Sequence, residues 1–92
     1  MYRDIDFKMS TLVLKSRNFS KIKEFFRINP KALLNKDTNG RNVLHWAVSH
    51  RDLELVKILY ALGVPIEKDK LGLNPLEMAR RLKATKIVNL LS

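Results

Sequence analysis

Residues 39–47 read Asn39-Gly40-Arg41-Asn42-Val43-Leu44-His45-Trp46-Ala47 and place a glycine-centred turn directly before an apolar helix. The pattern continues through a polar break at residues 49–52 into a second helix, Leu53 to Leu62. Gly63 follows this helix, where glycine accepts the positive φ of a helix C-terminus at little cost. Residues 37–68 therefore predict a turn followed by two antiparallel helices.

This unit recurs at a fixed distance along the chain. A shift of 32 positions aligns Asp37 with Asp69, Gly40 with Gly72, Leu44 with Leu76, Ala47 with Ala79, Leu55 with Ile87, Val56 with Val88, Ile58 with Leu90 and Leu59 with Leu91. Repetition at a period of this length is typical of a solenoid, in which neighbouring units bury a continuous core.

The repeated motif resembles the ankyrin repeat, whose signature is T-P-L-H-x-A in a unit of about 33 residues. The first copy reads Asp37-x-x-Gly40-x-Asn42-Val43-Leu44-His45-x-Ala47, and the second keeps Pro75 but has Glu77 in place of His. Both copies carry Asn where the family has Thr, and the spacing is one residue shorter. The resemblance covers Asp37 to Ser92.

The predicted fold is an all-α ankyrin-repeat solenoid forming a single domain over residues 1–92. We expect a divergent N-terminal repeat at about 9–36, a central repeat at 37–68 and a C-terminal repeat at 69–92. Inner helices are predicted near 10–17, 43–50 and 75–82, and outer helices near 20–28, 53–62 and 85–91. Met1 to Lys8 is predicted as an arm or a frayed first turn, and Ser20 as the cap of the first outer helix.

Periodicity also predicts the core. Met9, Leu12 and Val13 share one face of the first helix, and Leu14 is a further candidate for it. Nearly complete burial is expected for Leu44, Ala47, Leu55, Val56, Leu59, Leu76, Ala79 and Val88. Asp52 and Asn74 are predicted caps of later helices.

Composition narrows the classes of partner. The net charge is +9, distributed as +6 over residues 1–36, −1 over 37–69 and +4 over 70–92. Such a balance favours an acidic protein, nucleic acid or an anionic surface, or else serves solubility alone. The absence of cysteine excludes disulfides, and no apolar run is long enough for a membrane span. We expect a cytoplasmic protein, with delivery into another cell left open.

The chemically conspicuous residues have structural explanations. In the family that this chain resembles, the motif His hydrogen-bonds the backbone and the nearby turn, which implies a structural role for His45, oriented by Asn42. His50 is predicted to be exposed, and two histidines five residues apart do not provide a zinc site. Trp46 has two open roles, packing against a neighbouring helix or standing half-exposed as a binding anchor.

No catalytic motif is present. The sequence lacks a P-loop, a G-x-G-x-x-G and a G-x-S-x-G motif. Ser49 lies near His45 and His50 in sequence, but no carboxylate is placed to complete a triad. We expect no enzymatic activity, no cofactor and no metal.

The resemblance implies that the protein binds another protein, which the basic charge predicts to be acidic, through a concave face and the tips of its turns. By this analogy the partner-binding positions are Thr38, Asn39, Arg41, Trp46, Ser49, His50, Lys70, Leu71, Leu73, Arg81 and Leu82. Two narrower functions remain open: a small inhibitor or immunity-type protein that occludes a partner enzyme, and a binder of nucleic acid or an anionic surface.

The C-terminal region suggests two further surfaces. Arg80, Arg81, Lys83 and Lys86 form the densest basic cluster, which serves either phosphate binding or solvation. No aromatic residue lies among them to stack on a base. The last helix, with Ile87, Val88, Leu90 and Leu91, either mediates self-association or partner binding, or turns these side chains inward.

Overall fold

A computed structural model describes residues 2–92 of the chain, and their side chains from Phe7 onward. These residues form six α-helices and one 3-10 helix, with no strand among them. The elements are α1 (Tyr2–Lys15), α2 (Phe19–Ile28), η1 (Pro30–Leu33), α3 (Val43–Ser49), α4 (Leu53–Ala61), α5 (Pro75–Arg81) and α6 (Thr85–Leu91). The all-α prediction is confirmed.

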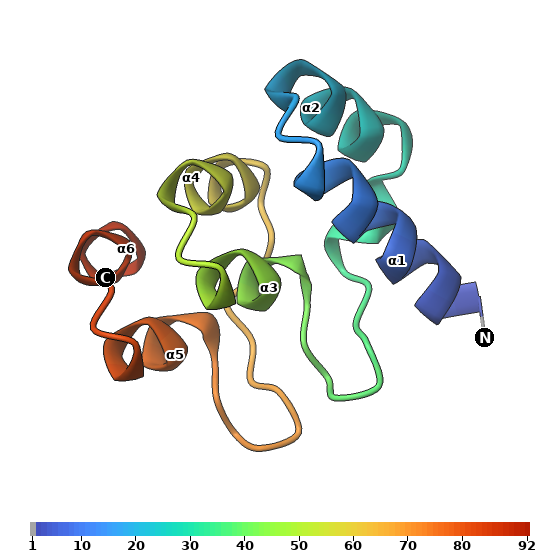
Figure 1. Cartoon of the computed structure of the whole chain (residues 1–92). Coiled ribbons are helices and arrows are strands. Elements are labelled where there is room, and N and C mark those ends of the chain that lie inside the picture. Colours follow the sequence, from blue (N-terminus) through green and yellow to red (C-terminus); the bar gives the residue numbers. More distant parts are fainter. Residues whose placement is uncertain (1) are drawn as a thin grey trace.

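The helices stack as three antiparallel pairs in two rows (Figure 1). The inner row contains α1, α3 and α5, and the outer row contains α2, α4 and α6. Long loops before α3 and before α5 project from the inner row, on the side away from the outer row. The architecture therefore offers loop ends and inner helices on one side, and outer helices on the other.

The first helix differs from its prediction. The helix α1 begins at Tyr2, so of the two alternatives for Met1 to Lys8 the arm is wrong for residues 2–8. Met1 lies outside the described residues. Its buried stripe is Phe7, Ser10 and Leu14, whereas Met9 is exposed. The predicted face is thus correct for Leu14, and Val13 packs against the core, but it is wrong for Met9 and Leu12. The reason is that the side of α1 with Phe7, Ser10 and Leu14 faces the stack.

Side-chain caps define where the helices begin. Asn42 accepts hydrogen bonds from the backbone N–H groups of Leu44 and His45, at 3.0 and 3.1 Å. The predicted caps Asp52 and Asn74 are confirmed, because each accepts from the first turn of its helix. The cap of α2 is Asn18, not the predicted Ser20, because the helix already begins at Phe19.

The core lies between the rows and between successive pairs. Its fully buried centre includes Leu14, Ile22, Val43, Leu44, Ala47, Val48, Val56, Leu59 and Ala79. Two predicted core residues, Leu76 and Val88, are only half-buried. Their counterparts Leu44 and Val56, 32 positions earlier, are fully buried because the α5–α6 pair covers them.

A basic residue occupies the turn between the two helices of each pair. Arg17, Arg51 and Lys83 adopt left-handed backbone conformations, with φ of 50°, 54° and 57°. The Arg17 guanidinium reaches the cap of the next outer helix, where its Nε lies 3.0 Å from an oxygen of Asp52. This contact ties the first pair to the central one at the outer edge.

Candidate protein-binding surface

An aspartate shapes each projecting loop. The Asp37 carboxylate accepts hydrogen bonds from the backbone N–H groups of Asn39 and Arg41, at 2.8 and 3.0 Å. Asp69 does the same for Leu71 and Leu73, at 2.8 and 2.9 Å. The hydrogen bond from Leu73 is the largest cause that lowers the pKa of Asp69. Both loops therefore end in the same tight turn.

The two turns lie against each other. The backbone N–H of Lys70 donates to the carbonyl oxygen of Asn39 at 3.0 Å, and Arg41 Nε donates to Asp69 at 3.3 Å. Gly40 has a φ of +75°, and a Cβ there would lie 3.1 Å from the Lys70 nitrogen. Glycine is therefore required for both the backbone conformation and the close approach. These contacts make one continuous surface from the two loop ends.

His45 supports this surface from behind. Its Nε2–H donates to the carbonyl oxygen of Leu73 at 2.9 Å, and its Nδ1 accepts from the backbone N–H of Asn42 at 3.2 Å. The side chain of Asn42 extends the connection, because its Nδ2 donates to the Pro65 carbonyl at 2.9 Å. Burial lowers the pKa of the His45 ring, which favours the neutral form that these bonds need. The structural role predicted for His45 is confirmed.

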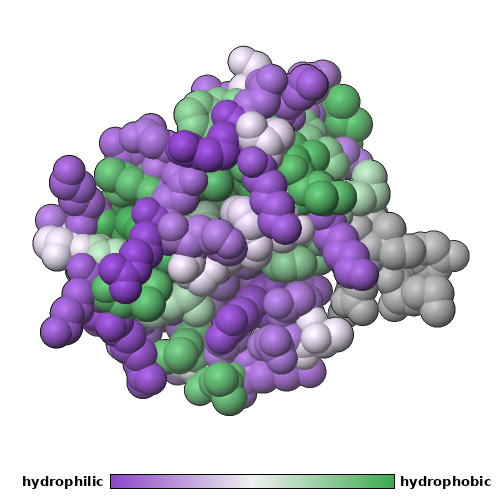
Figure 2. Space-filling view, in the orientation of Figure 1, coloured by the Kyte–Doolittle hydropathy of each residue, from purple (hydrophilic) through white to green (hydrophobic). Residues whose placement is uncertain are grey.

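The loop ends present the predicted contact residues to solvent to different degrees. Thr38, Asn39, Lys70 and Leu71 are exposed, and Leu71 retains 80% of its surface. Arg41 and Leu73 are half-buried, because they serve the joint between the loops. Hydrophilic side chains cover most of the face in Figure 2, with a hydrophobic patch at the end of the second loop.

The ends of the inner helices form a second group. Trp46 is half-buried against the core, and its ring stacks on His50 with centroids 4.1 Å apart. His50 Nδ1–H and the Ser49 hydroxyl both donate to the carbonyl oxygen of Trp46, at 2.9 and 2.6 Å. Trp46 therefore packs against the core and keeps part of its surface open to solvent, and its role as a binding anchor stays a prediction. Ser49 is engaged in closing its own helix. Further along, Arg81 is exposed and Leu82 is half-buried.

The basic cluster near the C-terminus is exposed throughout, at Arg80, Arg81, Lys83 and Lys86. Arg80 is paired with Glu77, with its Nη1 2.8 Å from the carboxylate, so part of this charge is already balanced. In the last helix, Ile87 and Leu91 are buried and Val88 and Leu90 are half-buried. Ile87 and Leu91 therefore do not belong to a self-association surface, and Val88 and Leu90 remain as candidates.

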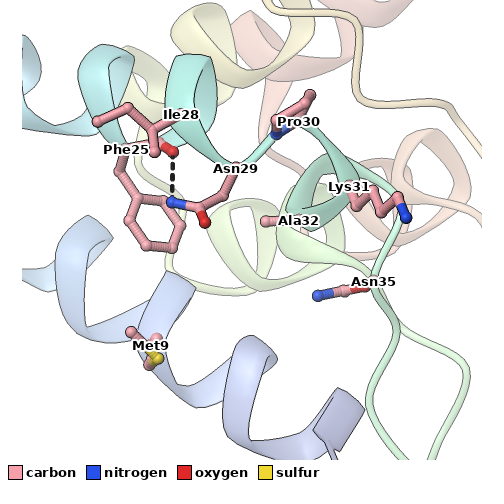
Figure 3. A pocket seen from close by; sticks show the side chains of 8 residues that line it. All are labelled: Met9, Phe25, Ile28, Asn29, Pro30, Lys31, Ala32 and Asn35. Atoms are coloured by element: carbon pink, nitrogen blue, oxygen red, sulfur yellow. Dashed lines mark hydrogen bonds between the residues drawn. The ribbon is translucent and has the colours of Figure 1, made fainter.

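Sequence reasoning missed a groove between α1 and α2 at the other end of the stack. Two adjoining hollows of about 390 and 480 Å³ share Phe25, Ile28 and Asn29. Figure 3 shows the Phe25 ring directed from α2 toward Met9 on α1. The available signal is a pair of apolar stripes with helical spacing, which periodicity alone assigns to the core. We call this feature the α1–α2 groove.

The described residues offer no group of three His, Asp or Glu side chains that could hold a metal ion. Between residues 2 and 92, no helix is long and apolar enough to cross a membrane.

A family model for ankyrin repeats, in three copies, matches residues 12–92. The chain belongs to the ankyrin-repeat family. The match includes most of the α1–α2 pair, where the sequence motif is absent, and agrees with the three stacked pairs of Figure 1. No curated protein and no solved structure matched the chain. Ankyrin repeats generally serve as protein–protein interaction modules and are typically not enzymes.

Proposed function

We propose that this ankyrin-repeat protein binds the acidic surface of a partner protein through its joined loop ends and the adjoining inner helices. The observation that carries the proposal is the side chain of Leu71, an 80% exposed leucine at the end of a rigid turn. An apolar side chain held in solvent by a hydrogen-bonded loop is suited to act as an interface anchor, because ordering it on binding costs little.

The charges around Leu71 support an acidic partner. Lys68 and Lys70 precede it in the same loop, both are exposed, and within the described residues neither is paired with a carboxylate. Complementary charge at the rim of an interface accelerates association and selects among partners, while the apolar centre supplies affinity. The chain's net charge of +9 acts in the same direction.

The test first captures partner proteins from the source cell with this protein as bait. Binding of the purified partner to the wild type and to the variants is then measured. The matched variants Leu71→Asp and Leu34→Asp make the same chemical change at two exposed leucines. Leu34 lies beside η1, far along the sequence from the second loop, and therefore serves as the control. We expect Leu71→Asp to weaken binding of the purified partner at least about tenfold, and Leu34→Asp to change it little.

Two outcomes contradict the proposal. The first is a partner whose affinity is the same for Leu71→Asp and wild type. The second is a captured nucleic acid whose binding falls steeply with salt, because phosphate contacts release counterions and a protein interface with an apolar centre responds less. The narrower role of an inhibitor requires, in addition, that the captured partner be an enzyme whose activity the wild-type protein blocks.

A further inference from the structure

We propose that the α1–α2 groove is a second binding site, which takes an acidic amphipathic helix of a partner protein. On the α1 side it is lined by Met9, Leu12 and Val13, and on the α2 side by Lys21, Phe25 and Ile28. Each set follows the spacing i, i+3, i+4 or i, i+4, i+7, which places its members on one face of a helix. Two antiparallel helices thus form a straight trough about 10 Å long, at 1.5 Å per residue.

The trough is apolar and open. Met9, Leu12 and Ile28 are 49%, 64% and 61% exposed, although each lies beside a hollow that would accept a side chain. Single exposed apolar residues are ordinary, but a contiguous concave group of them indicates an interaction site. Figure 2 shows hydrophobic surface over the α2 end of the molecule.

The central pair shows that the positions equivalent to the α1–α2 groove are buried there. The left-handed turns at Arg17 and Arg51 align the first two pairs at an offset of 34 residues, which matches Met9 with Val43 and Phe25 with Leu59. Both Val43 and Leu59 are fully buried.

The last pair repeats the arrangement. A shift of 32 from the central pair leads to Pro75, Ile87 and Leu91, and all three are buried. The later pairs contact the preceding ones through α3 with α1, α5 with α3 and α6 with α4. The α1–α2 groove therefore has the shape of a surface on which helices pack.

Lys21 departs from this apolar pattern, and its charge indicates which kind of helix the groove accepts. Lys21 aligns with Leu55 and Ile87, which are 2% exposed, so a cation stands where the other pairs have an apolar contact. An apolar helix packed there would bury the ammonium without a partner, which is costly. A helix with a carboxylate at that point would pair with it.

The surrounding charges have the same sign. Lys8 and Lys15 lie one turn on either side of Leu12 along α1, and Lys31 lines the hollow beyond Ile28. Within the described residues none of these lysines is paired with a carboxylate. Among the described residues that line the groove, the one acidic side chain is Glu24, which is held by Arg27, whose Nε donates to it at 2.9 Å. Like charges oppose a second copy of this groove as the occupant.

The experiment measures binding of a labelled, helix-stabilised peptide of about 18 residues. The peptide carries leucines at i, i+3, i+4 and i+7 and glutamates on both flanks, in the manner of helix-in-groove ligands. A peptide with lysines in place of the glutamates, and a scrambled peptide of the same composition, are the matched ligand controls. Fluorescence anisotropy gives the dissociation constants, and amide chemical shifts show where the peptide binds.

We expect the glutamate peptide to bind with shifts confined to α1, α2 and η1, and the two control peptides to bind at least about tenfold more weakly. Leu12→Asp and Ile28→Asp should each weaken binding about tenfold or more, whereas Leu34→Asp, an equally exposed leucine outside the groove, should change it less than about twofold. Lys21→Glu should weaken it, and Lys23→Glu, exposed on the same helix, should not.

Several results would overturn the proposal. They are equal binding of the glutamate and scrambled peptides, no binding of the glutamate peptide, and equal losses for Ile28→Asp and Leu34→Asp. A dimer that Ile28→Asp dissociates would assign the groove to a second copy of the chain. Binding to phosphatidylserine vesicles that Ile28→Asp abolishes would assign it to an anionic membrane. Leu71→Asp should leave the peptide affinity unchanged, so this site and the loop surface succeed or fail separately.

Discussion

Each end of the stack exposes a cation at a position where the central pair has a buried apolar residue, but the two cations differ in their partners. At the α5–α6 end, Arg80 occupies the position of the buried Val48, and it is paired with Glu77 one turn earlier on its own helix. At the α1–α2 end, Lys21 occupies the position of the buried Leu55, and no carboxylate pairs with it within the described residues.

The exposed charge at the α5–α6 end is therefore paired within the protein, whereas the exposed charge at the α1–α2 end is available to a partner. The Glu77–Arg80 pair balances its own charge, and Leu76 and Val88 at this end are half-buried. The α1–α2 groove combines an unbalanced cation with an open apolar trough. Terminal repeats need a polar outer face for solubility, and only the last pair has one in this form.

Moving the cation into the interior tests this comparison most severely. Leu55→Lys would place a lysine at the buried position 55, which aligns with the exposed Lys21 of the first pair. We expect a loss of at least about 3 kcal/mol in the free energy of unfolding, because the substitution removes buried apolar volume and buries an unpaired amine. Urea denaturation followed by circular dichroism measures it. A stability near that of the wild type would show that position 55 is not a packing contact.

His45→Ala compares the covered joint with the open end. The free energy of unfolding should fall by about 1–3 kcal/mol, because the mutation leaves the Leu73 carbonyl and the Asn42 N–H without their partner. The matched change at the last pair, Glu77→Ala, should cost less than about 0.5 kcal/mol, since it removes an exposed ion pair. Equal losses for the two variants would contradict the assigned roles.

The pH dependence of stability isolates the same joint. Burial lowers the pKa of His45 in the folded protein, whereas the unfolded chain keeps the ordinary value of 6.5. The unfolded chain therefore binds more protons below that pH, so the full contribution is present above about pH 6.5 and stability falls as the pH drops through it. Urea titrations at about pH 7.5 and 5.5 should show a decrease that His45→Ala reduces. A decrease of the same size in the variant would refute this linkage.

The lowering of the Asp69 pKa acts in a different window. Its contribution is present above its ordinary value of 3.8 and is lost only as the pH falls below that. Asp69 therefore does not contribute to a change in stability between about pH 7.5 and 5.5.

Arg80→Val should have the smallest effect on stability and would make the last end resemble the covered interior. It removes an exposed ion pair and joins Leu76 and Val88 into an apolar face. We expect stability to change by less than about 0.5 kcal/mol and size-exclusion chromatography to show concentration-dependent self-association. A variant that stays monomeric at all concentrations would mean that the charge pair does not protect this end.

The sequence was most informative where a local motif defines a local structure. The caps at Asp52 and Asn74 and the turn at Gly40 follow from residue types at fixed spacing, and all are present in the fold. The structural role of His45 was implied by the resemblance to the ankyrin repeat, and it is present as well. The sequence was less informative in the α1–α2 pair. The motif is absent there, the cap is Asn18 and not Ser20, and the helix begins at Tyr2.

The sequence by itself determined the helix pairs and the loop turns, because backbone hydrogen bonding and capping depend on residues close in the chain, and the 32-residue repeat shows that the unit recurs. The resemblance of that repeat to the ankyrin motif indicated the role of His45. Only the tertiary structure decided which apolar stripe of α1 faces the core, and how far Leu76, Val88 and the α1–α2 groove remain open. Burial depends on which helix packs against a given face, and the same spacing of apolar residues is compatible with either side of a helix.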